Sequence, residues 1–533
     1  GKKGACTMTI PTHAIEEMKD PKEITSVTLG TSPVSLEEFI AVARYHAKVE
    51  FSPQMEDKIT SVRKLVEKFL EESRPIYGVT TGFGDNVRHS ISKENAKQLQ
   101  LNIIRSHSTG VGEPLDEECV RAIMFAMLTN ARTGFSGVSL PTITQIKELL
   151  NRGVVPFVPG EGCIAGLSVE GHIALVLVGE GYAYVDGKKV PGAEALAKAS
   201  LSPITLGTKE GLDLLNGCLG AIGLSALALY NTIQCMKSAD IASAYSFETL
   251  KGTKKALDPR LMAAKCREEQ ADTAKNLLHI LEGSEIIDAN TDRTVQDPYV
   301  LRCAAQMSGA DKRVIKEAYR AICEEFNSCC DNPVIIPDET GEDGVALMEG
   351  NFDGSYTAMH MDSLCIAMAH LGKMCERRTD RLVNRHFSDY PGFLVKNPGL
   401  NSGYMITHYT SATLLIEIRS MLTPSSGDSI PVSANQEDPN TFTYVSAMKA
   451  YQCSRKLEYI VGIELMTQAQ AKDFITDLKS APVIEKVHSR IRSEIPTVEE
   501  DRYFYPDMEK IKDMVHEGTL VKTVEKEIGH LLF

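Results

Sequence analysis

Tyr77 lies in a glycine-rich segment, residues 76–84, whose composition suits a loop that closes over a ligand. A phenol is protonated at neutral pH, so Tyr77 could act as a general base only where nearby cations or hydrogen bonds lower its pKa. Taken alone, the segment favours a plainer interpretation, a turn tyrosine that covers part of the core. The segment therefore raises the question of base chemistry without answering it.

Arg302 is a second residue that could take part in chemistry. It lies in the segment 296–303, which also contains Gln296 and Tyr299. A guanidinium group offers two parallel donors and suits the carboxylate of a substrate. The alternative is a salt bridge at a surface or interface, which is the commonest role of an arginine. The residue type therefore indicates a carboxylate anchor but leaves the alternative open.

Several segments of the chain together resemble the histidine and aromatic amino acid ammonia-lyase family. They are residues 76–84, 102–110, 162–172, 210–217 and 296–303, and the resemblance runs from about residue 34 to the carboxyl end. It implies that Tyr77 removes the β proton of the substrate and that Arg302 binds its carboxylate. It also implies that Asn216, Gln296 and Tyr299 line the site.

One segment departs from the family at its most reactive point. Family members cyclise an Ala-Ser-Gly tripeptide into an electrophilic methylidene-imidazolone (MIO), and the serine loses its hydroxyl as water. Counting back from His172, the matching residues are Cys163, Ile164 and Ala165. Ile164 has no hydroxyl to lose, and Ser168 stands four positions too late. We therefore expect neither MIO nor another cofactor.

Two residues indicate an imidazole-type substrate. His107 and Glu437 match the histidine-processing branch of the family, and a carboxylate can accept the N–H donors that an imidazole ring has and a phenyl ring lacks. Their plainer alternatives are a satisfied buried histidine and a helix-end glutamate. Phe352 also follows the family pattern, whereas Asp353 and Pro439 replace histidines of that branch. The substrate expected is a histidine derivative rather than histidine.

An enzyme of this kind without MIO needs a substrate whose nitrogen leaves unaided. A trimethylammonium group is permanently cationic and departs as neutral trimethylamine, so we expect a histidine betaine, first of all ergothioneine, which would yield thiourocanate. Tyr77 would be the base, and Glu437 and His107 would hold the ring. Lys396 could meet the sulfur of the ring, although most lysines are solvated.

Other functions stay open at this point. The chain could be an inactive lyase paralogue with a binding or regulatory role, or it could act on hercynine or histidine. It could also form MIO by an unusual route in which Cys163 loses hydrogen sulfide, although the order of residues there does not suit cyclisation. The intact segments around Tyr77 and Arg302 argue against an inactive chain.

The composition is that of an ordinary globular protein with a large core, since the 533 residues are 43% hydrophobic and 24% charged. A net charge of −14 argues against a nucleic-acid partner. Without a run of about 18 apolar residues or a signal-peptide pattern, we expect a cytoplasmic protein with no membrane partner. The 13 scattered cysteines favour reduced thiols, and even the close pair Cys329 and Cys330 predicts no metal site.

Long helices must position these residues. The apolar periodicity of residues 355–383 and 441–474 predicts a bundle of long helices from about residue 212 onward. Pro141 opens a shorter helix that Gly153 closes. Asp186-Gly187 between two short apolar runs predicts a β-hairpin. The expected fold is mainly α and resembles histidine ammonia-lyase, with a smaller amino-terminal lobe that holds minor β structure.

We expect three regions along the chain. They are an amino-terminal segment at residues 1–33, a lobe at residues 34–210 with the Tyr77 loop and the degenerate triad, and a helical region at residues 211–533. The family resemblance further implies a homotetramer in which each active site draws residues from three subunits. Long apolar helix faces would need such partners on their own account.

Overall fold

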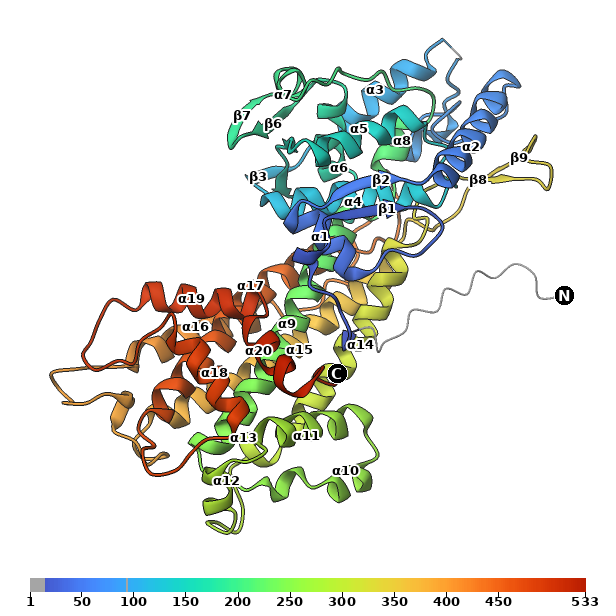
Figure 1. The fold of residues 1–533 in the computed structure, drawn as a ribbon. Helices are drawn as coiled ribbons and strands as arrows, with labels where there is room; N and C mark the ends of the chain where they lie inside the picture. Colours follow the sequence, from blue (N-terminus) through green and yellow to red (C-terminus); the bar gives the residue numbers. More distant parts are fainter. Residues whose placement is uncertain (1–14, 93) are drawn as a thin grey trace.

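The computed structural model describes residues 15–92 and 94–533, and it is mainly helical. Figure 1 shows an upper lobe and a lower bundle of long helices, with α9 (Leu219–Thr249) running from one into the other. The expected mainly α fold with minor β structure is confirmed. The region boundaries stay predictions, and residues 1–14 of the expected amino-terminal segment lie outside the described residues.

The upper lobe consists of short helices around small sheets. Its helices are α1 (Leu36–Tyr45), α2 (Pro53–Glu71), α3 (Ala96–His107), α4 (Glu117–Arg132), α5 (Leu140–Asn151), α6 (Ser168–Leu177), α7 (Gly192–Lys198) and α8 (Glu210–Leu215). The strand β1 (Ser26–Leu29) pairs parallel with β2 (Lys48–Phe51). The strand β3 (Val111–Pro114) pairs antiparallel with β5 (Pro159–Glu161). A third, antiparallel sheet has the strand order β4 (Val155–Pro156), β6 (Tyr182–Val185), β7 (Lys188–Pro191).

The β-hairpin β8 (Val334–Pro337) and β9 (Gly344–Leu347) packs on α2, so a part of the chain beyond residue 210 lies with the upper lobe. The helices of the lower bundle follow α9 in chain order. They are α10 (Pro259–Lys265), α11 (Glu268–Leu281), α12 (Glu285–Asn290), α13 (Tyr299–Arg302), α14 (Ala304–Phe326), α15 (Ser355–Val383), α16 (Met405–Ser420), α17 (Thr443–Lys472), α18 (Pro482–Arg492), α19 (Tyr505–His516) and α20 (Thr519–Ile528).

The helix α9 forms the centre of the core, because every one of its 31 residues is buried. It packs against α4, α14, α15 and α17, so no face of it is left for solvent. The segment Glu210–Thr249 is long and apolar enough to cross a membrane, yet 94% of its most apolar window is buried inside the protein. Its apolar character is therefore explained by packing.

The predicted local elements are confirmed where the patterns were strongest. The helix α15 spans Ser355–Val383 as expected, and α17 ends within two residues of the predicted limits. The hairpin turn has Asp186 at φ 50° and Gly187 at φ 77°, the left-handed pair that a two-residue turn needs. The helix that Pro141 opens is α5.

A buried ion pair joins α15 to α17. The Arg378 guanidinium donates from Nη2 to Glu464 Oε1 at 2.7 Å and from Nε to Oε2 at 2.9 Å, and the side chains are 1% and 0% exposed. Burial alone would lower the pKa of Arg378, but the charge of Glu464 raises it. Arg378 therefore stays charged, and removing either partner leaves the other side chain unpaired in the core.

Replacing Arg378 with alanine should lower the free energy of unfolding by about 3–5 kcal/mol, because Glu464 is left without its partner. The matched control is Arg320→Ala, which removes an exposed pair with Glu324 four residues along α14 and should cost about 0.5 kcal/mol or less. Denaturant unfolding followed by circular dichroism measures both values. Equal costs for the two variants would contradict the role of the buried pair.

Candidate active site

Tyr77 lies in the loop that follows α2. Its hydroxyl oxygen accepts a hydrogen bond from the Gly84 amide at 2.9 Å, and the Phe83 ring meets the Tyr77 ring edge-on with centroids 6.0 Å apart. Gly78 has φ +69°, and an ideal Cβ there would lie 2.6 Å from Leu212 Cδ2, so only glycine fits. The loop thus holds the phenol in a fixed, half-buried position.

The electrostatics of one chain keep the Tyr77 phenol protonated. Burial raises its pKa, and the charge of Glu437 raises it further, while the hydrogen bond from Gly84 works in the opposite direction. A base needs the opposite shift. The cation that would lower the pKa of Tyr77 therefore has to come from the substrate or from another chain.

Glu437 lies beside the Tyr77 loop in a tight turn. The backbone of Val432 and Glu437 is paired, and the three residues between them that have positive φ are Ser433, Ala434 and Asn435. The Ser433 hydroxyl accepts a hydrogen bond from the Asp85 amide at 3.1 Å, which docks this turn on the Tyr77 loop. Left-handed non-glycine residues are costly and collect at functional sites. The turn presents Glu437 as an exposed carboxylate.

His107 is the last residue of α3 and also lies beside the Tyr77 loop. Its ring meets the Phe83 ring edge-on with centroids 6.4 Å apart, and its Nδ1 lies 3.0 Å from the Ser106 hydroxyl. Burial lowers the pKa of His107, so the imidazole is neutral at pH 7. Phe83 therefore links Tyr77 to His107, a bridging role that the sequence analysis did not assign to it.

The degenerate triad forms a turn directly before α6. The Ile164 carbonyl accepts from the Tyr444 amide at 3.0 Å, and the Cys163 thiol donates to the Gly166 carbonyl at 3.1 Å. Burial raises the pKa of the Cys163 thiol to about 12, so it is no nucleophile. The residues present do not fit MIO, because Ile164 offers no hydroxyl for the dehydration that creates the methylidene group.

Asn216 and the loop that carries Phe352 are linked through Asn332. The Asn216 amide donates to the Asn332 carbonyl at 2.6 Å and lies 3.4 Å from Asp331 Oδ1. The Glu349 amide donates to Asn332 Oδ1 at 3.0 Å, which places the Phe352 loop beside the same segment, and Phe352 itself is exposed. Gly166 approaches the Gly217 carbonyl so closely that no Cβ would fit. The triad, Asn216 and the Phe352 loop are therefore assembled where the upper lobe meets the bundle.

The residues around Tyr77 and the residues around the triad are held by the same helices. Gln100 in α3 donates to the Gly78 carbonyl at 2.9 Å and accepts from the Gly211 amide in α8 at 2.9 Å. At the other end of α3, an ideal Cβ on Gly171 in α6 would lie 3.2 Å from the His107 backbone carbon. The helices α3, α6 and α8 thus hold the Tyr77 loop, His107 and the triad as one unit.

Arg302, the predicted carboxylate anchor, lies elsewhere in the chain. Arg302 donates from Nη1 to Gln296 Oε1 at 2.9 Å, and its guanidinium lies 4.8 Å from the centre of the Tyr299 ring. Tyr299 and Arg302 are on α13, and Gln296 precedes it, at the end of the bundle remote from α3 (Figure 1). Lys396 forms an exposed ion pair with Glu499 at 3.3 Å. One chain therefore does not bring Arg302 or Lys396 to Tyr77.

Glu170 is a site residue that the sequence analysis missed. It is fully buried in the first turn of α6, and its Oε1 accepts from the Gly220 amide at 2.6 Å, at the beginning of α9. Its Oε2 has no hydrogen-bond partner, and burial raises the pKa of its carboxyl to about 8. The available signal was an acid within an apolar helix, since Val169, Ile173 and their neighbours are core residues.

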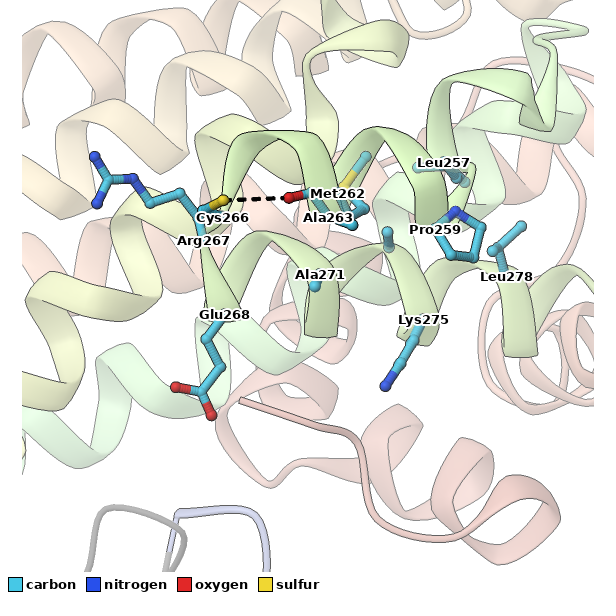
Figure 2. A pocket seen from close by; sticks show the side chains of 11 residues that line it. Leu257, Pro259, Met262, Ala263, Cys266, Arg267, Glu268, Ala271, Lys275 and Leu278 are labelled. Atoms are coloured by element: carbon cyan, nitrogen blue, oxygen red, sulfur yellow. Dashed lines mark hydrogen bonds between the residues drawn. The ribbon is translucent and has the colours of Figure 1, made fainter.

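A separate hollow of about 310 Å³ lies between α10 and α11, and Figure 2 shows it. Its lining is mostly apolar, and Cys266 stands at its edge with its thiol donating to the Ala263 carbonyl at 3.3 Å. None of the residues that the sequence predicts for the site lines it. The hollow is thus distinct from the candidate active site.

Comparison with known proteins gives consistent matches over almost the whole chain. A family model for aromatic amino acid lyases matches residues 34–493. Histidine ammonia-lyase of Symbiobacterium thermophilum is 38% identical over 509 residues, which cover 95% of this chain and 99% of that protein. The crystal structure of histidine ammonia-lyase from Trypanosoma cruzi has a TM-score of 0.87 at 34% identity, covering 94% of this chain and 95% of that chain. Ergothionase from Treponema denticola, an ergothioneine-degrading enzyme crystallised with desmethyl-ergothioneine sulfonic acid, has a TM-score of 0.84 at 27% identity, covering 93% and 99%.

Replacing Glu170 with glutamine should change how stability depends on pH. A carboxyl whose pKa is raised to about 8 in the folded state binds its proton more tightly there than in the unfolded chain. Stability from this group is therefore complete below the unfolded pKa and declines by about 1.4 kcal/mol per pH unit until pH passes about 8. Glutamine keeps an acceptor for the Gly220 amide and has no such decline.

The free energy of unfolding of Glu170→Gln, relative to the unchanged chain, should accordingly rise from pH 5 to about pH 8 and then level off. Urea unfolding at a series of pH values measures it. Glu113→Gln, at an exposed position in β3, serves as the control and should show no such trend. A flat difference for Glu170→Gln would mean that the Glu170 carboxyl is ionised in the folded protein.

Proposed function

The chain belongs to the aromatic amino acid lyase family, and from this premise we propose a carbon–nitrogen lyase that eliminates trimethylamine from a histidine betaine without MIO. Ergothioneine is the first candidate substrate, with thiourocanate as the other product. The observation that carries the proposal is a contrast within one site. Ile164 stands where MIO formation needs a serine, whereas Tyr77, His107 and Glu437 remain together around Phe83 and Ser433.

The chemistry of the leaving group explains this contrast. An α-amino group leaves poorly, and in the family MIO assists its departure. A trimethylammonium group needs no such help, because it already carries a full positive charge. Tyr77 as phenolate takes the β proton, the electrons of the C–H bond form the carbon–carbon double bond, and the electrons of the C–N bond leave with neutral trimethylamine. The reaction consumes no cofactor.

The electrostatics of the Tyr77 phenol favour a cationic substrate. Burial and Glu437 raise its pKa in the chain alone, so the free enzyme holds the proton. A permanent positive charge bound nearby stabilises the phenolate and lowers that pKa. The substrate would therefore help to activate its own base. An ordinary amine can lose its charge by losing a proton, and a trimethylammonium group cannot.

Glu437 and His107 suit the ring of such a substrate. An exposed carboxylate can accept an N–H of an imidazole-type ring, and the neutral His107 imidazole can donate or accept according to its tautomer. Phe352, which is 40% exposed, offers an aromatic face to the trimethylammonium group. Each part of a histidine betaine thus has a matching group, except the carboxylate.

We propose that a neighbouring subunit of a homotetramer supplies the carboxylate anchor. Arg302 lies on α13, remote from α3 in the same chain. The helices α15 and α16 also carry large apolar side chains that are each more than half exposed: Tyr356, Met359, Ile366, Ile406, Tyr409 and Ile416. An apolar surface of this kind marks a protein interface. Assembly would cover it and bring Arg302 of one chain to Tyr77 of another.

Histidine ammonia-lyase activity is the second candidate. It is favoured by the relatives at 38% identity, whereas the ergothionase likeness is at 27%. That activity would require an electrophile from Cys163, Ile164 and Ala165, which offer no serine hydroxyl. The two candidates differ in the amine that they release, so one assay separates them.

The purified chain should release trimethylamine from ergothioneine and produce the ultraviolet band of a conjugated thiourocanate. The same assay with hercynine and with histidine provides the comparison. Trimethylamine from hercynine at an equal rate would extend the assignment to histidine betaines in general. Release of ammonia from histidine would contradict the proposal. No reaction with any of the three substrates would favour an inactive paralogue.

A subunit that lacks the base and a subunit that lacks the anchor should together recover part of the activity that each has lost. Tyr77→Phe removes the proton acceptor and should lower the turnover number by about 10²–10⁴-fold, and Arg302→Met should chiefly raise KM for the betaine. Co-expression of the two variants should restore part of the activity, because some sites then combine an intact Tyr77 with an intact Arg302.

Tyr182→Phe, on the exposed hairpin of the upper lobe, is the control and should leave activity unchanged. Steady-state kinetics of each variant and of the co-expressed mixture measure the effects. A mixture no more active than the sum of its parts would contradict a site shared between subunits. Full activity of Tyr77→Phe would contradict its role as the base.

A further inference from the structure

Three potential metal ligands converge behind the loop that carries Asn216. They are Cys218 directly before α9, Glu325 in the last turn of α14, and Cys330 in the segment that leads to β8. Their ligand atoms all lie within 4.8 Å of one another. The Cys218 thiol lies 3.7 Å from Glu325 Oε1, and the Cys330 thiol lies 3.4 Å from the same oxygen.

These distances match the edges of a metal-centred tetrahedron. Zinc–sulfur bonds of about 2.3 Å and zinc–oxygen bonds of about 2.1 Å give sulfur-to-oxygen edges of about 3.6 Å. The two observed sulfur-to-oxygen separations lie on either side of that value. Both sulfur-to-oxygen edges therefore suit a cation of this size, and the two sulfurs lie within 4.8 Å of each other.

The surrounding backbone fixes the ligands in place. The Cys330 amide donates to Asn130 Oδ1 at 2.7 Å, and Gly217 packs on Cys330 so closely that its ideal Cβ would lie 3.0 Å from the Cys330 carbonyl. Cys218 and Cys330 are 0% and 1% exposed, and Glu325 is half-buried. Such a rigid and mostly buried setting suits a bound ion.

We propose that Cys218, Glu325 and Cys330 form a three-ligand site for one thiophilic divalent cation of the Zn²⁺ and Cd²⁺ class. Two sulfur ligands favour such a cation over Mg²⁺ or Ca²⁺, which prefer oxygen. The proposal replaces the sequence-based expectation that no metal site exists. Metal binding at these three residues does not depend on the substrate, so its test is independent of the proposed function.

The site would lock the segment that holds Asn216. Cys218 is two residues after Asn216, and Cys330 is two residues before Asn332, whose carbonyl accepts from the Asn216 amide at 2.6 Å. A cation held by both cysteines would tie these two segments together beside their hydrogen bond. Its binding should therefore stabilise the fold at the junction of the lobes.

The test uses the 533-residue chain, reduced and freed of metal with a chelator, and titrated with Cd²⁺. One equivalent per chain should produce the ultraviolet charge-transfer band of a cadmium–thiolate site, and Zn²⁺ should displace it. Cys218→Ser and Cys330→Ser should each diminish the band, and Glu325→Gln, which preserves size and shape, should weaken binding roughly tenfold or more. Thermal unfolding should show a higher Tm with one equivalent of Zn²⁺ than without it.

Cys266→Ser is the matched control, because that thiol is exposed at the hollow of Figure 2 and belongs to no such cluster among residues 15–92 and 94–533. It should leave the band and the stoichiometry unchanged. Absence of a band in the unchanged chain would overturn the proposal. So would binding that persists undiminished in Glu325→Gln and Cys330→Ser, or binding that Cys266→Ser abolishes. If a cysteine variant fails to fold, Glu325→Gln alone decides the result.

Discussion

The beginning of α9 is the point on which the candidate site depends. The helix is buried along its whole length, so its first amides cannot reach water, and Glu170 accepts the one from Gly220. That bond fixes the start of α6, and with it the turn that contains Ile164. Asn216 and Cys218 lie in the segment directly before α9, at the same helix end. A single buried helix terminus therefore sets the relative positions of the triad turn and the segment that faces it.

This arrangement explains how the triad can differ from Ala-Ser-Gly, and so lose the chemistry of that tripeptide, and still leave the architecture intact. The turn at Ile164 is held by its carbonyl, which accepts from Tyr444, and by the Cys163 thiol. Neither bond needs a serine side chain or a cyclised tripeptide. The fold around the turn therefore tolerates the missing hydroxyl, while any reaction that needs an electrophile there does not. A substrate with a better leaving group is the chemical consequence that we propose.

The sequence predicted what depends on short-range patterns. The limits of α15 followed from periodicity, and the hairpin at Asp186 followed from the left-handed conformation that its turn requires. The proximity of Tyr77 to Glu437 was implied by family resemblance alone, because nothing in the spacing of residues so far apart indicates contact. Long-range contacts without a motif were missed. Glu170 accepting from Gly220 is one such contact, and the convergence of Cys218 with Cys330 is another.

The central claim is that residues 163–165 remain an ordinary tripeptide, and the mass of the proteolytic peptide that contains them tests it most directly. Tandem mass spectrometry of the native, fully folded chain after digestion should return the unmodified mass of the Cys163-Ile164-Ala165 sequence. A peptide lighter by hydrogen sulfide and one water, with the loss mapped to these residues, would reveal a cyclised electrophile. That result would contradict the account and favour the chemistry of an ammonia-lyase.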